Sequence, residues 1–256
     1  MQQPLVIFNK DGDGIATLTL NRPEKFNAFT REMVTEWHRL LLDVEDDPSV
    51  KVKVLTGAGK GFCAGGDIGG QKETAEKESL ERKNYLFRHV YTIALMMDKI
   101  DKPTIAAING PARGAGFDMA LMCDLRIMAQ SATVAESYIS VGLIAGDGDT
   151  YYLPRLIGMS KAMGLYWTGR VVTADEAERM GIANRVVADD RLLPAIYELA
   201  RQIAEQPFEA VRAYKRAAHH GAEMSLAAHL IPQSLRRNRA GLNQRFPNWS
   251  WHRQGT

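Results

Sequence analysis

Two glycine-rich loops are the first features of the chain that could do chemistry. One runs from Gly57 to Asp67, the other from Asn109 to Gly116, and both are rich in glycine and alanine. Such small residues let a ligand approach the main chain closely, so peptide N–H groups remain free to donate hydrogen bonds to it. Two such donors can form an oxyanion hole, which stabilises the negative oxygen that develops when a carbonyl compound reacts.

Other chemical motifs in the chain are incomplete. Neither glycine loop matches a P-loop, and Met119 stands where a dinucleotide-binding loop that begins at Gly114 would need glycine. The stretch from Asp11 to Gly14 lacks the later ligands of a calcium loop, and His219-His220 has no third ligand at a metal-binding spacing. The sequence therefore predicts no metal site and no resident cofactor.

Acidic side chains near these loops are candidates for proton transfer. Asp118 follows the second loop, where it could act as a general acid or base or could only satisfy N–H groups at a helix start. Asp147 and Asp149 belong to a third flexible loop. Glu136 lies two residues before Tyr138, and in an extended segment their side chains would share a face. Glu136 is a reserve candidate for proton transfer, and a structural ion pair is its alternative role.

The loops must be positioned by alternating strands and helices. Strands are expected at 5–8 and 15–20, where the Asp11–Gly14 turn favours a hairpin, and then at 50–55, 104–108, 124–129 and 133–135. Thr30 is a candidate N-cap for a helix whose apolar residues recur on one face. Further helices are expected at 85–97, 117–122, 151–167, 192–206 and 208–219. This alternation indicates an α/β domain.

Composition and charge narrow the class of protein. The chain has 256 residues, of which 45% are hydrophobic and 24% charged, as in a soluble globule with a large core. A formal charge of +2 excludes capture of nucleic acid or an anionic membrane by a global field. Two cysteines, Cys63 and Cys123, and no run approaching the ~18–20 apolar residues of a membrane span predict a cytoplasmic protein without membrane partners.

The carboxyl-terminal segment is locally basic. Between Arg212 and Arg253 the chain has eight Lys or Arg residues and one acid, Glu223. This pattern is typical of a solvated helix face, and it would equally suit a surface that docks a phosphorylated ligand or another subunit.

Several motifs together resemble the enoyl-CoA hydratase/isomerase family, the crotonase superfamily. The resemblance covers nearly the whole chain in the right order, and it rests on Asn21-Arg22-Pro23-Glu24-Lys25-Phe26-Asn27-Ala28, Ala64-Gly65-Gly66-Asp67-Ile68, and the segments 102–110, 114–124 and 168–187. It implies a crotonase-like spiral of repeated ββα units in residues 1–200. A helical region at 201–256 would then build homotrimers, commonly paired into hexamers.

The resemblance also implies a substrate and a site. The substrate would be an acyl-CoA thioester, with coenzyme A entering as part of it, and the peptide N–H groups of Gly66 and Ala115 would stabilise its enolate. Coenzyme A would bind along residues that match the family's binding segments, namely Lys25, Phe26, Ala28, Ala64, Gly66, Asp67 and Ile68. The closing segment Arg245–Trp249 resembles a family motif, and the basic tail would contact the CoA phosphates across a subunit boundary.

The catalytic acids depart from the family's pattern. Typical hydratases have one Glu at the position of Asp118 and a second at the position of Tyr138. Dehalogenases and dienoyl-CoA isomerases of the superfamily use a loop acid that aligns with Gly146, one residue before Asp147. We therefore expect Asp118, Asp147 and the Tyr138 hydroxyl to move protons, while the acyl pocket is shaped by residues 85–97, Tyr138, Tyr151 and Tyr152.

Hydration of a 2-enoyl-CoA is the leading expectation for the reaction. Double-bond isomerisation, and carbon–carbon hydrolysis of a cyclic acyl-CoA or diketone, could proceed through the same enolate. A binding or assembly protein stays open as a different class, because some relatives in the superfamily bind RNA. The near-neutral total charge argues against nucleic acid as a partner, whereas the basic terminal segment argues for it.

Overall fold

A computed structural model describes residues 3–67, 91–226 and 228–229 of the chain. The chain forms two compact units, Met1–Val211 and Arg212–Thr256. All of the strands in the described residues belong to the first unit. In the second unit the described chain is mainly the carboxyl-terminal part of helix α10 (Phe208–Gly221).

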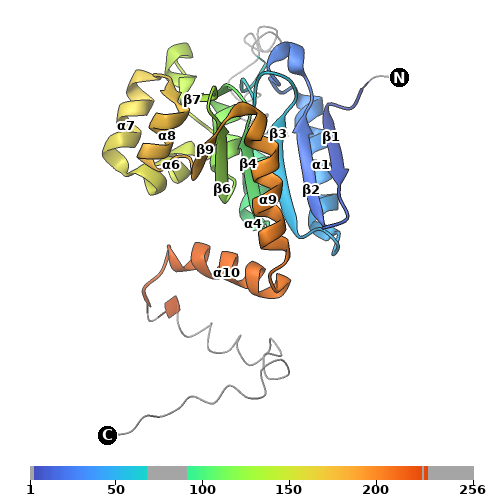
Figure 1. Cartoon of the computed structure of the whole chain (residues 1–256). Helices are drawn as coiled ribbons and strands as arrows, with labels where there is room; N and C mark the ends of the chain where they lie inside the picture. Colours follow the sequence, from blue (N-terminus) through green and yellow to red (C-terminus); the bar gives the residue numbers. More distant parts are fainter. Residues whose placement is uncertain (1–2, 68–90, 227, 230–256) are drawn as a thin grey trace, which may run out of the picture. The chain divides into compact units, whose positions relative to one another are not determined.

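A six-stranded sheet is the scaffold of the first unit (Figure 1). Its order is β1 (Val6–Lys10), β2 (Ile15–Leu20), β3 (Val52–Gly57), β4 (Thr104–Ile108), β6 (Leu125–Ala129) and β9 (Arg185–Val187). The first two strands form the predicted antiparallel hairpin, and all later neighbours are parallel. The Asp11 carboxylate closes the hairpin turn by accepting the N–H groups of Asp13 and Ile15 at 3.0 and 2.9 Å.

A smaller sheet and a set of helices complete the unit. The three-stranded sheet has the order β5 (Ala112–Arg113), β7 (Thr133–Ala135) and β8 (Val172–Thr173). Among the described residues, the α-helices of this unit are α1 (Arg31–Asp46), α4 (Tyr91–Lys99), α5 (Ala115–Leu121), α6 (Asp149–Ile157), α7 (Met159–Thr168), α8 (Ala174–Met180) and α9 (Leu192–Ala204). Short 3₁₀ helices are η1 (Pro23–Lys25), η4 (Ser137–Val141) and η5 (Asp189–Arg191).

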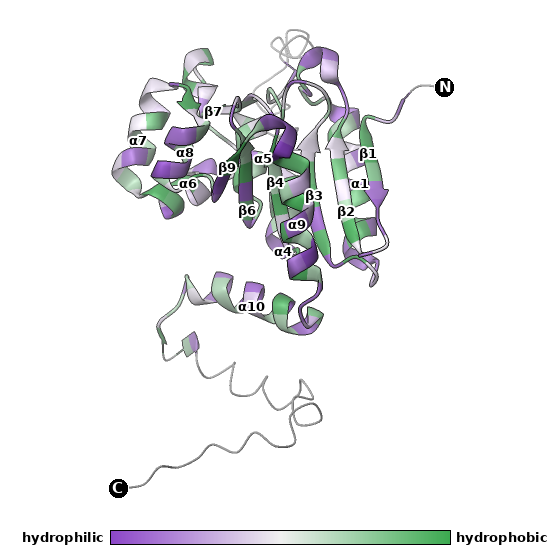
Figure 2. Cartoon of the chain, in the orientation of Figure 1, coloured by the Kyte–Doolittle hydropathy of each residue, from purple (hydrophilic) through white to green (hydrophobic). Residues whose placement is uncertain are grey.

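Helices cover both faces of the large sheet. Figure 1 shows α9 in front of the strands and α1 behind them. Thr30 caps α1 by accepting the Met33 N–H, as the sequence predicts, and the apolar face of the helix turns inward. Figure 2 shows β2 and β4 as largely hydrophobic, whereas α8 is mostly hydrophilic. This contrast fits strands that are buried between two layers of helices.

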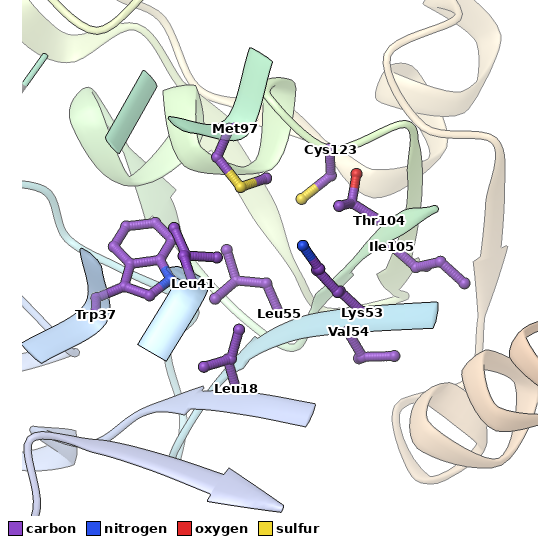
Figure 3. A pocket seen from close by; sticks show the side chains of 10 residues that line it. All are labelled: Leu18, Trp37, Leu41, Lys53, Val54, Leu55, Met97, Thr104, Ile105 and Cys123. Carbon is purple, nitrogen blue, oxygen red and sulfur yellow. The ribbon is translucent and has the colours of Figure 1, made fainter. Parts of the chain in front are cut away.

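The core around β3 is tightly packed and includes the buried, positively charged side chain of Lys53. All six residues of β3 are buried, Lys53 among them, and its Nζ lies 2.5 Å from a Glu45 carboxylate oxygen on α1. A cavity of about 10 Å³ beside this pair is lined by Trp37 and other core side chains (Figure 3). It has room for about one water molecule, so this gap cannot be a substrate site.

The parallel pairing of β3 with β4 brings the two glycine loops together. Parallel neighbours end at the same edge of a sheet. The loop after Gly57 and the loop after Ile108 therefore leave from one edge, and the second loop leads directly into α5. In open α/β sheets this carboxyl edge is where ligands bind.

Candidate active site

The two glycine loops touch each other, and their glycines make the contact possible. Gly65 has a φ of +87°, a conformation that L side chains rarely adopt, and a Cβ there would lie 2.9 Å from the Arg113 carbonyl oxygen and 3.7 Å from the Ala115 nitrogen. A Cβ on Gly116 would lie 2.2 Å from the Cys63 carbonyl oxygen. Larger residues would push the loops apart, so these glycines set the spacing between the loops.

Two peptide N–H groups in these loops are available to a ligand. Phe29 pairs with the loop by donating to the Gly65 carbonyl at 2.9 Å and by accepting the Asp67 N–H at 3.1 Å, a pattern that skips the Gly66 N–H. Ala115 is the first residue of α5, where helical N–H groups have no partner in the preceding turn. Within the described part of the chain, neither N–H has a hydrogen-bond partner.

Asp118, Tyr138 and Asp147, predicted from three separate segments, come together in the structure. Asp118 is fully buried on α5, three residues after Ala115. The Tyr138 hydroxyl, on η4, donates to its Oδ2 at 2.5 Å, and the same hydroxyl lies 3.4 Å from Asp147 Oδ2. One phenolic proton thus lies between two carboxyl groups.

Glu136 and Asp149 belong to the same cluster, which the sequence does not reveal. Carboxylate oxygens of Asp118, Glu136 and Asp149 all lie within 4.8 Å of one another. The expectation that Glu136 and Tyr138 share a face of an extended segment is wrong, because β7 ends at Ala135 and the chain turns into η4. An ion pair for Glu136 is also absent among the described residues, where neither of its oxygens has a hydrogen-bond partner.

Burial and mutual repulsion raise the pKa values of these acids. Burial raises the pKa of Asp147 to about 6, against the hydrogen bond from Tyr138, and burial also raises the pKa of Asp149 to about 6. The pKa values of Asp118 and Glu136 lie well above their ordinary range, first because of burial and then because other carboxylates are close. With pKa values of about 6, Asp147 and Asp149 can both take up and release protons near neutral pH.

The segments predicted to bind coenzyme A lie side by side. The Ala64 N–H donates to the Phe26 carbonyl at 2.9 Å, which joins the segment after η1 to the first glycine loop. Lys25, Phe26 and Ala64 are exposed, whereas Ala28 is buried. Gly66 and Asp67 continue the same strip of chain, and Ile68 lies outside the described residues. The exposed side chains and main chain along this strip are accessible to a ligand.

Two further residues hold this strip in place and were missed as site residues. Asn27 is buried at a φ of +57°, and its Nδ2 donates to the Gly61 carbonyl at 2.8 Å. Arg22 donates to the Ala28 carbonyl, and its Nη2 lies 3.0 Å from Asp67 Oδ2. Both residues stand in the motif that suggested the family, but only their contacts show that they brace the segment predicted to bind coenzyme A.

Two aromatic rings lie close to the acidic loop, and their role in an acyl pocket stays a prediction. A Cβ on Gly146 would lie 3.3 Å from the Tyr91 ring, and one on Gly148 would lie 3.0 Å from the Tyr152 ring. Tyr151 instead stacks under the Arg155 guanidinium, which lies 3.6 Å from its ring centre. Residues 85–90 and Arg245–Trp249 lie outside the described part of the chain.

Comparison with known proteins shows which family this chain belongs to. The family model for enoyl-CoA hydratase/isomerase matches residues 10–235. The chain belongs to the enoyl-CoA hydratase/isomerase family. Crotonyl-CoA hydratase of Syntrophomonas wolfei is 36% identical over 222 residues, which cover 86% of this chain and 84% of that protein. The 1,2-epoxyphenylacetyl-CoA isomerase of Escherichia coli is 38% identical over 194 residues, which cover 76% of this chain and 74% of the isomerase.

A solved structure agrees with these relatives. The crystal structure of enoyl-CoA hydratase from Bacillus anthracis superposes with a TM-score of 0.86 at 32% identity, and covers 92% of this chain and 90% of that one. The predicted crotonase-like α/β fold, the family and the enzyme class are thereby confirmed. The protein is an acyl-CoA-processing enzyme of this family. No helix within the described ranges is long and apolar enough to cross a membrane.

Proposed function

We propose that the protein adds water to a 2-enoyl-CoA thioester, or removes it in the reverse direction. The observation that carries this proposal is the Asp118–Tyr138–Asp147 group, in which one hydroxyl contacts two buried carboxyl groups beside the free N–H groups of Gly66 and Ala115. Hydration needs a proton taken from water and a proton given to carbon. Two carboxyl groups linked by a hydroxyl can do both.

The proton transfers balance within this group. The carboxylate of Asp147 takes a proton from water as the water oxygen bonds to C3 of the enoyl group, and the electron pair of the double bond moves onto the thioester oxygen. The N–H groups of Gly66 and Ala115 stabilise this enolate oxygen. The carboxylic acid of Asp118 then gives its proton to C2. Tyr138 resets the site by accepting the proton of Asp147 while its own proton passes to Asp118.

Isomerisation is the second candidate reaction. Moving a double bond requires a proton to leave one carbon and arrive at another, for which Asp118 and the Tyr138 hydroxyl at 2.5 Å suffice. The likeness to the epoxyphenylacetyl-CoA isomerase also favours this candidate. Carbon–carbon hydrolysis needs the same enolate site and remains the third expectation.

Mass spectrometry of products made in ¹⁸O-labelled water tests the proposal. A panel of linear 2-enoyl-CoA, dienoyl-CoA and cyclic acyl-CoA substrates should show gain of one labelled water in the linear enoyl product. Asp118→Asn should slow turnover by ~100-fold or more, since it cannot donate the proton. Asp46→Asn, an exposed matched change, should leave the rate unchanged. Unchanged mass with a new absorbance would establish isomerisation instead, and no reaction with any thioester would refute the proposed reaction.

Assembly, ligand contacts and location belong to the same proposal. Coenzyme A would lie along Lys25, Phe26, Ala28, Ala64, Gly66, Asp67 and Ile68, and the basic terminal segment would meet its phosphates. A homotrimer or hexamer is supported by apolar side chains left exposed around η4 and α7, namely Ile139, Val141, Leu143, Ile144 and Trp167. Sedimentation would measure the assembly. A cytoplasmic location is supported by the two buried cysteines, which form no disulfide and suit a reducing compartment.

A further inference from the structure

Glu136 is a buried acid that the proposed proton transfers do not use. Only 2% of its surface is exposed, and it stands at the junction of β7 and η4. Its carboxylate approaches Asp118 on α5 and Asp149 on α6, with oxygens of all three residues within 4.8 Å of one another. Three elements thus bring three acids to one buried point behind the Asp118–Tyr138 pair.

Two hydrogen-bond donors near this cluster each bond to one of its carboxylate oxygens. The Tyr138 hydroxyl donates to Asp118 Oδ2, and the Thr150 N–H donates to Asp149 Oδ1. Within the described chain, Asp118 Oδ1, both Glu136 oxygens and Asp149 Oδ2 have no hydrogen-bond partner. Buried carboxylate oxygens that lack donors are strongly destabilised unless the acids themselves hold protons.

We propose that Glu136 is a positioning residue that shares protons with Asp118 and Asp149, and so keeps Asp118 in its acid form between turnovers. Two adjacent carboxyl groups can bond to each other only when one of them is protonated, because a carboxylate has no proton to donate. The shared proton therefore gives Glu136 its missing donor. It also keeps one proton on the Asp118–Glu136 pair between turnovers, so that Asp118 can act as the acid that the hydration step requires.

The surroundings of Glu136 favour retention of this proton. The titratable groups that face it are Asp118, Asp149, Asp147, Tyr138 and Tyr166, all of them acids or phenols. Burial comes first among the causes that hold the pKa of Glu136 well above its ordinary range, and the charge of Asp149 comes next. A cluster of this kind titrates as a unit, so removing one member changes the proton affinity of the others.

The pH profile of Glu136→Gln tests this role, which rests on the proposed function of Asp118. An amide carries no charge and can donate an N–H to Asp118, so the basic limb of the kcat profile should move down by about 1–2 pH units. Turnover should fall by ~10-fold or more at pH 8 and stay near the wild-type value at pH 5.5. Glu136→Asp keeps a carboxyl group and should leave the basic limb near its wild-type position, and the exposed change Glu198→Gln should cause no shift. An equal loss of turnover at every pH would refute the proposal.

Infrared spectroscopy of the free enzyme tests the shared proton without any substrate. At pH 7 the wild-type enzyme should show the C=O stretch of a buried carboxylic acid, and Glu136→Gln should weaken it. If this band is present while no thioester reacts, the shared proton is supported and the proposed hydration is refuted. If the wild-type enzyme lacks the band, the inference about Glu136 is refuted, whether or not a thioester reacts. Loss of the wild-type band on adding Mg²⁺ or Ca²⁺ at pH 7, restored by a chelator, would show that the cluster holds a cation, and would also overturn it.

Discussion

Replacing Asp147 by Asn should make the enzyme more stable and less active. Burial raises the pKa of Asp147 from its ordinary value of 3.8 to about 6. A difference of about 2 pKa units corresponds to roughly 3 kcal/mol by which the ionised side chain destabilises the folded state. Asn removes the charge but must still bury an amide. We therefore expect about 1–3 kcal/mol of added stability at pH 8.

The stability difference should depend on pH in one direction. A carboxyl group whose pKa is raised on folding binds more protons in the folded than in the unfolded state, so stability falls as pH rises between the two pKa values. For Asp147 this window runs from 3.8 to about 6. Below about pH 4 Asp147 is neutral, so the Asn variant should be no more stable than wild type, and its full added stability should be present only above about pH 7.

Urea unfolding at fixed protein concentration, repeated from pH 4 to pH 8, measures this difference. Asp46→Asn is the control, and this exposed change should alter the free energy of unfolding by less than about 0.5 kcal/mol at every pH. Turnover of a 2-enoyl-CoA by Asp147→Asn should fall by ~100-fold, because the amide cannot take a proton from water. A variant that is less stable than wild type at pH 8, or a difference independent of pH, would refute the reasoning about the buried charge.

Two further substitutions test the geometry of the site. Gly65→Ala places a Cβ 2.9 Å from the Arg113 carbonyl at a φ of +87°, so it should destabilise the fold by about 1–3 kcal/mol in urea unfolding, and turnover should fall as the Gly66 N–H shifts. Unchanged stability and rate would argue against a close fit of the two loops. Tyr138→Phe removes the hydroxyl that donates to Asp118, so steady-state kinetics should show a fall in kcat of ~10-fold or more with little change in KM. A rise in KM at constant kcat would instead assign Tyr138 to substrate binding.

Local patterns in the sequence were sufficient to predict much of the fold. The Asp11–Gly14 turn, the cap at Thr30 and the glycine loops at 57–67 and 109–116 depend on short-range physical chemistry, and the structure has the expected hairpin, helix and loops. The alternation of valine with lysine in β3 gave no sign that Lys53 is buried. Its partner Glu45 lies on α1, so only the packing of that helix on the sheet makes burial possible.

The acid cluster at the site likewise could not be predicted in full from the sequence. Asp118, Tyr138 and Asp147 were candidates because of the positions that they occupy in the resemblance to the family. The sequence could not show that Glu136 faces Asp118 and Asp149, because the chain turns into η4 after β7 and their contact spans three elements.

The sequence by itself determined the family, the two glycine-rich loops and the acids available for chemistry, because these follow from residue type and short-range spacing. Tertiary structure alone decided which acids meet, which N–H groups stay free, and which carboxyl groups have raised pKa values. Burial and the approach of like charges arise only when separate elements pack together. Proton affinity in this enzyme is therefore a property of the folded cluster, which no single segment carries.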